Sequence, residues 1–169
     1  MTILEAEEAI TPATAQQLGL ISFAMGSGLT MMAGFVLWTY FSAAATIPTP
    51  QDVKFINTLT TAAMIVTLFL IGASEVAWRS LLRKSPGPLS GRVHVAFIVR
   101  LACREGAGLL GMTVVYLAAH NGVLRAYPAY WVNSAPYVLF LGFLTTHWPS
   151  AGKLADDARG VLAASSRGL

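Results

Sequence analysis

The chain has 169 residues, of which 55% are hydrophobic and only 11% are charged, and its mean hydropathy is +0.61. Soluble domains carry about 25% charged residues, so this composition excludes an ordinary soluble domain and indicates an integral membrane protein. The formal net charge of +3 is not gathered into a basic tract or a basic–aromatic patch, so no nucleic-acid partner is expected.

Apolar stretches predict an all-α fold with four transmembrane helices in two antiparallel hairpins. A helix needs about 20 mostly apolar residues to cross about 30 Å of hydrocarbon. In chain order, we expect an N-terminal segment, four spans and a tail: 1–17, 18–41, 55–82, 93–119, 130–148 and 150–169. The tail is expected to be a weak amphipathic helix or a solvated end. The N-terminal segment is acidic and lacks the basic start of a signal peptide.

The first span contains small residues at intervals of four: Ser22, Gly26, Thr30 and Gly34. Such a stripe lets another backbone approach closely. We expect it to pack within the bundle, and a contact face for another chain or another copy is the alternative. After this span, Thr49–Pro50 with Asp52 predicts a helix start. Further along the chain, Asn121–Gly122 predicts the end of a helix.

The second and third spans contain charged residues. Glu75 lies eight residues before Arg83, and Arg100 lies eight residues after Arg92. In an antiparallel hairpin Glu75 and Arg100 then lie at similar depth, which predicts a contact between them. A charge at the bilayer centre costs at least about 2.5–3.5 kcal/mol, so such side chains are expected to pair. The sequence therefore predicts a buried, neutral cluster formed by Glu75, Arg100, Arg104 and Glu105.

The stretch "EGAGLLGM", residues 105–112, places a carboxylate within the third span, followed by small residues. It resembles the carboxylate-bearing helix of the rotor-ring c subunit of ATP synthases, the proteolipid family. The resemblance covers at most the second and third spans. It implies that Glu105 takes up and releases a transported proton or sodium ion.

The histidines suggest a second alternative. His94 and His147 are expected near the cytoplasmic side of the third and fourth spans, where two facing histidines could ligate a b-type haem. Polar residues at helix ends are the simpler interpretation, and no cofactor or metal is expected.

Pro136 is expected to kink the fourth span. Aromatic residues near span ends predict interfacial belts: Trp38, Tyr40, Trp78, Tyr127, Tyr130, Trp131 and Trp148.

Basic residues set the expected orientation. The connection between the second and third spans holds Arg83, Lys84 and Arg92, whereas the other two connections hold one basic residue each, Lys54 and Arg125. The positive-inside rule then places this connection and both termini in the cytoplasm of a multi-pass inner-membrane protein.

Three functional hypotheses follow. The chain contains no HExxH, GxSxG or P-loop motif and no soluble domain, so an enzyme is not expected. The first hypothesis is a non-enzymatic accessory or structural subunit in the lipid bilayer, which self-associates or joins other membrane subunits. The second is proton or cation translocation by Glu105, and the third is a haem-b electron carrier.

Overall fold

The computed structural model is all-α and describes residues 10–42 and 47–166. Much of the predicted N-terminal segment, residues 43–46 and the end of the tail lie outside the described residues. The elements in chain order are α2 (Pro12–Ser42), α3 (Pro50–Lys84), α4 (Leu89–His120), α5 (Val123–Ala126), the 3-10 helix η1 (Pro128–Ser134), α6 (Ala135–Thr146) and α7 (Ala151–Ser166). The first three helices extend beyond the predicted spans at both ends.

Local sequence explains where the long helices begin and end. The backbone N–H of Thr49 donates to Asp52 Oδ2 at 2.9 Å, and the N–H of Asp52 donates to Thr49 Oγ1 at 3.2 Å. This reciprocal capping box starts α3 as predicted. At the same end of the bundle, the left-handed φ of +74° at Gly122 terminates α4 where the Asn121–Gly122 pair predicted a break.

Two of the described helices, α2 and α3, are long and apolar enough to cross a membrane. Of the four predicted spans, two therefore meet this criterion of length and hydropathy. The helix α4 is long enough, but Arg92, Arg100, Arg104 and Glu105 lower its hydropathy. The predicted span 130–148 is not one helix, because η1 precedes a 12-residue α6. Pro136 does not kink a longer helix; it lies in the first turn of α6, where a missing N–H is tolerated.

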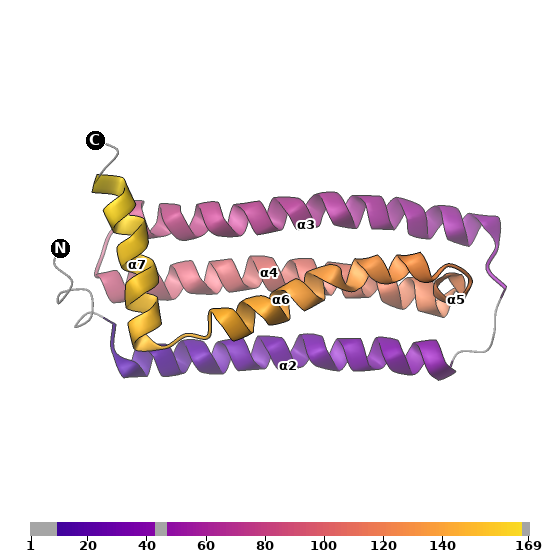
Figure 1. Cartoon of the computed structure of the whole chain (residues 1–169), viewed down its shortest axis with the longest axis horizontal. Coiled ribbons are helices and arrows are strands. Elements are labelled where there is room, and N and C mark those ends of the chain that lie inside the picture. Colours follow the sequence, from indigo (N-terminus) through magenta and orange to yellow (C-terminus); the bar gives the residue numbers. More distant parts are fainter. Residues whose placement is uncertain (1–9, 43–46, 167–169) are drawn as a thin grey trace.

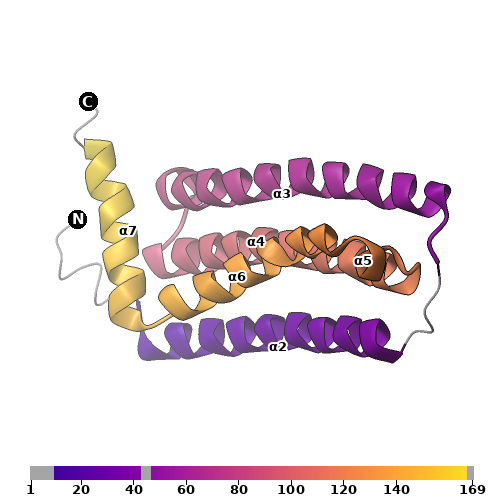
Figure 2. The same cartoon turned by 45° about the vertical axis from the view of Figure 1, so that its right-hand side comes forward.

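The helix α4 lies at the centre of the bundle and packs against α2, α3 and α6 (Figure 1). Although α2 and α3 are consecutive and antiparallel, they lie on opposite sides of α4 in both views (Figure 2). The predicted arrangement of two packed hairpins is therefore wrong for the first pair. The second and third helices do form the predicted antiparallel hairpin, joined by a short turn at Gly87.

Glycines in α4 explain why its neighbours come so close. A Cβ added to Gly108 would lie 2.6 Å from Leu29 Cδ2 of α2, and one added to Gly111 would lie 2.2 Å from the Asn133 carbonyl oxygen of η1. Both separations are far inside van der Waals contact. The small residues of α4 therefore set the distance to two different neighbours.

The helix α7 lies crosswise over the end of the bundle that also carries the α3–α4 turn (Figure 1). Leu154, Ala155 and Ala158 are buried, and α7 contacts both α2 and α3. Of the two expectations for the tail, the helix is correct and the solvated end is wrong.

We predict that Gly111→Ala lowers the free energy of unfolding by about 2 kcal/mol, because its methyl group would collide with backbone rather than with a flexible side chain. Gly72→Ala is the matched control. Gly72 lies within α3 with open space around its Cα, so alanine should raise stability by about 0.5–1 kcal/mol through helix propensity. Thermal unfolding in detergent measures both changes, and equal effects would contradict the packing argument.

Candidate functional site

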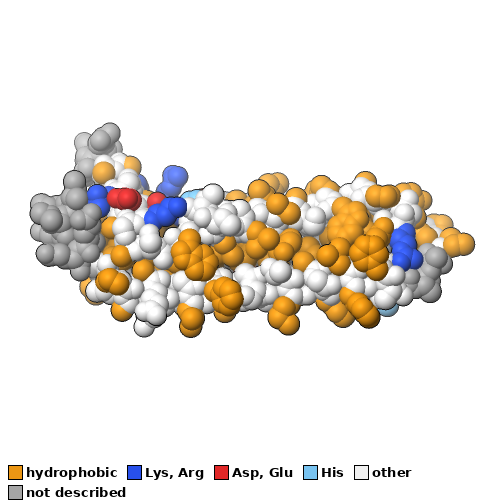
Figure 3. Space-filling view, turned by 60° about the horizontal axis from the view of Figure 1, so that its bottom comes forward, with side chains coloured by type: hydrophobic (Ala, Val, Ile, Leu, Met, Phe, Trp, Pro, Cys, Tyr) orange, Lys and Arg blue, Asp and Glu red, His pale blue; other side chains and the backbone are white. Residues whose placement is uncertain are grey.

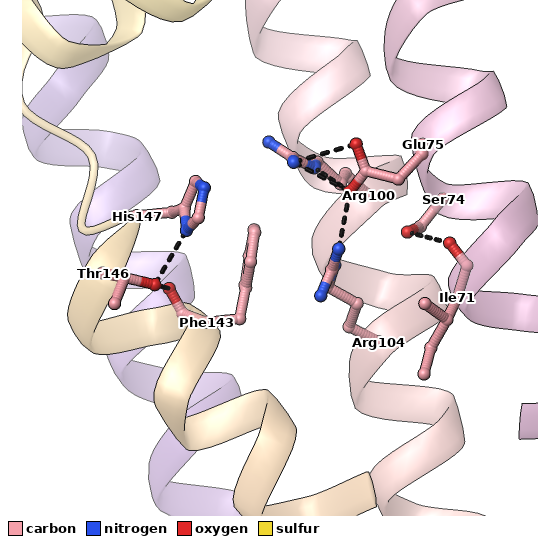
Figure 4. Close-up of polar contacts among 8 residues, drawn as sticks. All are labelled: Ile71, Ser74, Glu75, Arg100, Arg104, Phe143, Thr146 and His147. Atoms are coloured by element: carbon pink, nitrogen blue, oxygen red, sulfur yellow. Dashed lines mark hydrogen bonds and ion pairs between the residues drawn. The ribbon is translucent and has the colours of Figure 1, made fainter. Parts of the chain in front are cut away.

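An ion-pair cluster connects α3 to α4. Arg100 donates from Nε and Nη2 to Glu75 Oε1, at 3.0 and 2.8 Å, and from Nη2 to Glu75 Oε2 at 3.0 Å. Arg104, one turn further along α4, donates from Nη2 to Glu75 Oε1 at 2.5 Å. The predicted contact between Glu75 and Arg100 is therefore present (Figure 4).

A third helix, α6, also contributes to the cluster, and the sequence did not indicate this. The Cζ atoms of Arg100 and Arg104 lie 5.1 and 4.3 Å from the ring centroid of Phe143. Arg100 also lies 5.3 Å from the Trp78 ring. Trp78, predicted to belong to an interfacial belt, is only 3% exposed. Cation–π contacts of this kind stabilise guanidinium groups that have lost water.

Burial of the cluster is uneven. The side chain of Arg100 is 10% exposed and that of Arg104 is 18% exposed, whereas that of Glu75 is 33% exposed. The prediction of a wholly buried cluster was therefore wrong. Two aromatic rings lie against the guanidinium of Arg100 and one lies against that of Arg104, whereas a third of the Glu75 side chain is exposed.

Glu105 does not belong to the cluster. Successive residues of an α-helix point about 100° apart, so Arg104 faces α3 and Glu105 does not. Its side chain is half-buried and makes no ion pair or hydrogen bond with the described part of the chain. The cluster thus contains two arginines and one glutamate, and the predicted neutrality is wrong.

The small-residue stripe of α2 divides into two parts. Ser22 and Gly26 are buried, and a Cβ on Gly26 would lie 2.8 Å from Leu144 Cδ1 of α6. Thr30 donates to the Gly26 carbonyl oxygen at 2.8 Å, and its hydroxyl lies 3.5 Å from that of Tyr137. Gly34 is exposed, with open space where a Cβ would be. Gly26 and the exposed Thr30 therefore contact α6, whereas Gly34 leaves its part of the stripe open.

The two histidines lie in different surroundings. The His147 ring stacks on Phe143 with centroids 4.6 Å apart, and its Nδ1 lies 2.9 Å from Thr146 Oγ1. His94 is half-buried on α4. Within the described ranges, no contact joins the two rings and no group of three or more metal-ligating side chains occurs. The haem hypothesis gains no support from this arrangement.

Asn133 is a buried polar residue that the sequence interpretation missed. Its Nδ2 donates to Thr60 Oγ1 of α3 and to the Tyr130 carbonyl oxygen, both at 3.0 Å. Asn133 also borders a cavity of about 260 Å³ between α3 and α6, whose other lining residues are mostly apolar. The amide attaches η1 to α3, and the cavity offers no charged group for catalysis. In the sequence, only the polar Asn133–Ser134 pair between apolar residues could have indicated a buried polar contact here.

Comparisons of the chain with protein-family models, with curated proteins and with solved structures found no match. No relative therefore assigns a role to any residue. The roles proposed below follow from contacts, charge and exposed surface.

We predict that Glu75→Gln lowers the free energy of unfolding by about 2 kcal/mol, because two enclosed guanidiniums lose their shared counter-ion. Glu105→Gln is the matched control with the same change of charge, and it should stay within about 0.5 kcal/mol of wild type. Thermal unfolding in detergent at neutral pH tests both variants. A loss of stability in Glu105→Gln as large as that in Glu75→Gln would show that Glu105 is a structural counter-ion.

Proposed function

We propose that the chain is a small, non-enzymatic inner-membrane protein with four crossings and both termini in the cytoplasm. In this proposal it is an accessory or structural subunit that self-associates or joins a larger membrane complex. The observation that carries the proposal is its exposed apolar surface.

That surface follows the outer faces of α2 and α3. No charged residue occurs in α2, and none occurs in α3 from Phe55 to Ser74. On the face in Figure 3, hydrophobic side chains occupy the middle of the molecule and the charged ones gather towards its ends. An apolar surface of this extent requires a bilayer or a partner. Its large members, each more than half exposed, include Leu20, Phe23, Met31, Trp38, Phe41, Ile65, Leu68 and Phe69.

The dimensions support four crossings. The charge-free part of α3, residues 55–74, is about 30 Å long at 1.5 Å per residue, which equals the hydrocarbon thickness. The antiparallel α4 runs alongside it. Because a 3-10 helix rises about 2 Å per residue, η1 and α6 together also extend roughly 30 Å.

The distribution of basic residues supports the orientation. Arg79, Arg83, Lys84 and Arg92 lie at or near the α3–α4 turn, and Lys153 lies on α7 at the same end. Lys54 and Arg125 lie at the opposite end. The positive-inside rule then places the α3–α4 turn and α7 in the cytoplasm, where the crosswise α7 would lie along the membrane interface.

The proposed subunit role makes two predictions. The protein should remain in the membrane pellet after an alkaline carbonate wash. In mild detergent it should have a mass of at least twice the 17.9 kDa chain, or retain another membrane protein. A carbonate-soluble protein would contradict the membrane placement, and a lone monomer would contradict the subunit role.

Two leucine substitutions identify the associating face. Gly34 on α2 and Gly72 on α3 are exposed, with open space around them, so Gly34→Leu and Gly72→Leu should leave the protomer folded. Each variant is the control for the other. The variant on the associating face should reduce the measured mass to that of a monomer, and the other should not change it.

Proton or cation translocation by Glu105 is the second candidate. The observation that favours it is the separation of Glu105 from both arginines, which are engaged by Glu75. A transporting carboxyl group must be able to become neutral, and an arginine partner would oppose that. Gly106, the neighbour of Glu105, faces Leu70 in the charge-free part of α3, which supports an intramembrane position for an ionisable residue with a function.

Labelling with dicyclohexylcarbodiimide, which modifies protonated carboxyl groups in apolar surroundings, tests this candidate. We expect Glu105 to be labelled increasingly as the pH falls, while Glu75 in its ion pairs is spared. Glu105→Gln should abolish the labelling. Labelling of both carboxylates, or of neither, would argue against translocation.

A further inference from the structure

The ion-pair cluster carries an unbalanced positive charge. Arg100 and Arg104 share the single carboxylate of Glu75. No other carboxylate in the described part of the chain pairs with either guanidinium. A net charge of about +1 therefore lies beside the rings of Trp78 and Phe143. An enclosed charge without a counter-ion is costly, so the site favours an anion from outside the chain.

Donors remain available for that anion. The contacts with Glu75 use Nε and Nη2 of Arg100 but only Nη2 of Arg104. Within the structure as described, Nη1 of each arginine donates to no protein group, and Nε of Arg104 is buried without a partner. In Figure 4 the two guanidiniums lie on neighbouring turns, between Glu75 and the side occupied by Phe143 and His147. Adjacent guanidinium forks suit the oxygens of a phosphate group.

The depth of the cluster points to the source of the phosphate. Glu75 directly follows the charge-free, roughly 30 Å stretch of α3. If that stretch crosses the hydrocarbon, Glu75 and Arg100 lie at its cytoplasmic boundary, next to the lipid headgroups. The cytoplasmic leaflet holds the anionic lipids, and basic pockets between transmembrane helices on that side bind their headgroups.

We propose that Arg100 and Arg104 bind the phosphate of an anionic phospholipid from the cytoplasmic leaflet through the donors that Glu75 leaves free, in a site bordered by Phe143. This inference rests on the membrane placement proposed above. It goes beyond the subunit role, because it assigns a specific lipid class to the cluster. A carboxylate from a partner helix would have to reach the boundary of the bilayer, where phosphates are already present.

The test uses the full-length protein in detergent, with dioleoyl phosphatidylglycerol as the probe, dioleoyl phosphatidylcholine as the neutral lipid and inorganic phosphate as the free anion. Native mass spectrometry and thermal unfolding report binding. We expect phosphatidylglycerol to bind wild type about tenfold more tightly than phosphatidylcholine and to raise its Tm. Inorganic phosphate should give no comparable shift in Tm. A full shift with phosphate alone would overturn the lipid in favour of a soluble anion.

Three variants separate a specific site from general attraction. Arg104→Gln should weaken phosphatidylglycerol binding about tenfold. Arg79→Gln, the same change on an exposed residue at this end of α3, should leave it unchanged. Glu75→Gln should bind phosphatidylglycerol more tightly than wild type although it is less stable, because both guanidiniums lose their competitor. A damaged fold cannot produce that increase, so Glu75→Gln keeps the test valid if Arg104→Gln does not fold.

The remaining outcomes are decisive. Equal losses in Arg104→Gln and Arg79→Gln would overturn a built site, and weaker lipid binding by Glu75→Gln would overturn the role of the free guanidiniums. Loss of a co-purifying protein from Arg104→Gln, with lipid binding unchanged, would assign the site to a partner's carboxylate instead. If the protein resists carbonate extraction but binds both lipids equally, the lipid site is overturned and the membrane placement stands. If carbonate extracts the protein, both the membrane placement and the lipid site are overturned.

Discussion

The close approach of neighbouring elements to α4 is the constraint on which the rest of the structure depends. Because Gly108 has no side chain, Leu29 of α2 can pack against it, and the backbone of η1 at Asn133 packs against Gly111 in the same way. With side chains at these positions, α2 and η1 would have to move outward. Because α6 continues from η1, its position over α4 also depends on Gly111. The glycines of the "EGAGLLGM" stretch thus have a packing role that is separate from any role of Glu105.

The position of α6 in turn creates the aromatic wall of the ion-pair cluster. Phe143 covers the two guanidiniums only because α6 crosses α4 at the level of Arg100 and Arg104. A similar dependence holds in α2, where Gly26 lies against Leu144 of α6. Three helices therefore contribute to the cluster. Its charged residues come only from α3 and α4, and α6 supplies the aromatic ring.

The proposed membrane placement and the proposed lipid site share one physical origin. Apolar residues dominate the middle of the molecule, while charged residues occur mainly where α3 and α4 approach the end crossed by α7. Arginine tolerates this boundary because its long side chain can meet a carboxylate, an aromatic face and a phosphate together. Glu105 is the exception, since it lies further inward without an arginine partner.

Hydropathy and spacing alone determined the helical class, the helix breaks at Pro50 and Asn121–Gly122, and the meeting of Glu75 with Arg100. These depend on local preferences and on the register of one short hairpin, which are readable along the chain. Only the tertiary structure decided that α4 is central, that Glu105 is separate from the arginines, and that Phe143 and Asn133 contribute. Those features depend on which face of each helix meets which neighbour, and that choice is made by close packing between residues far apart in the sequence.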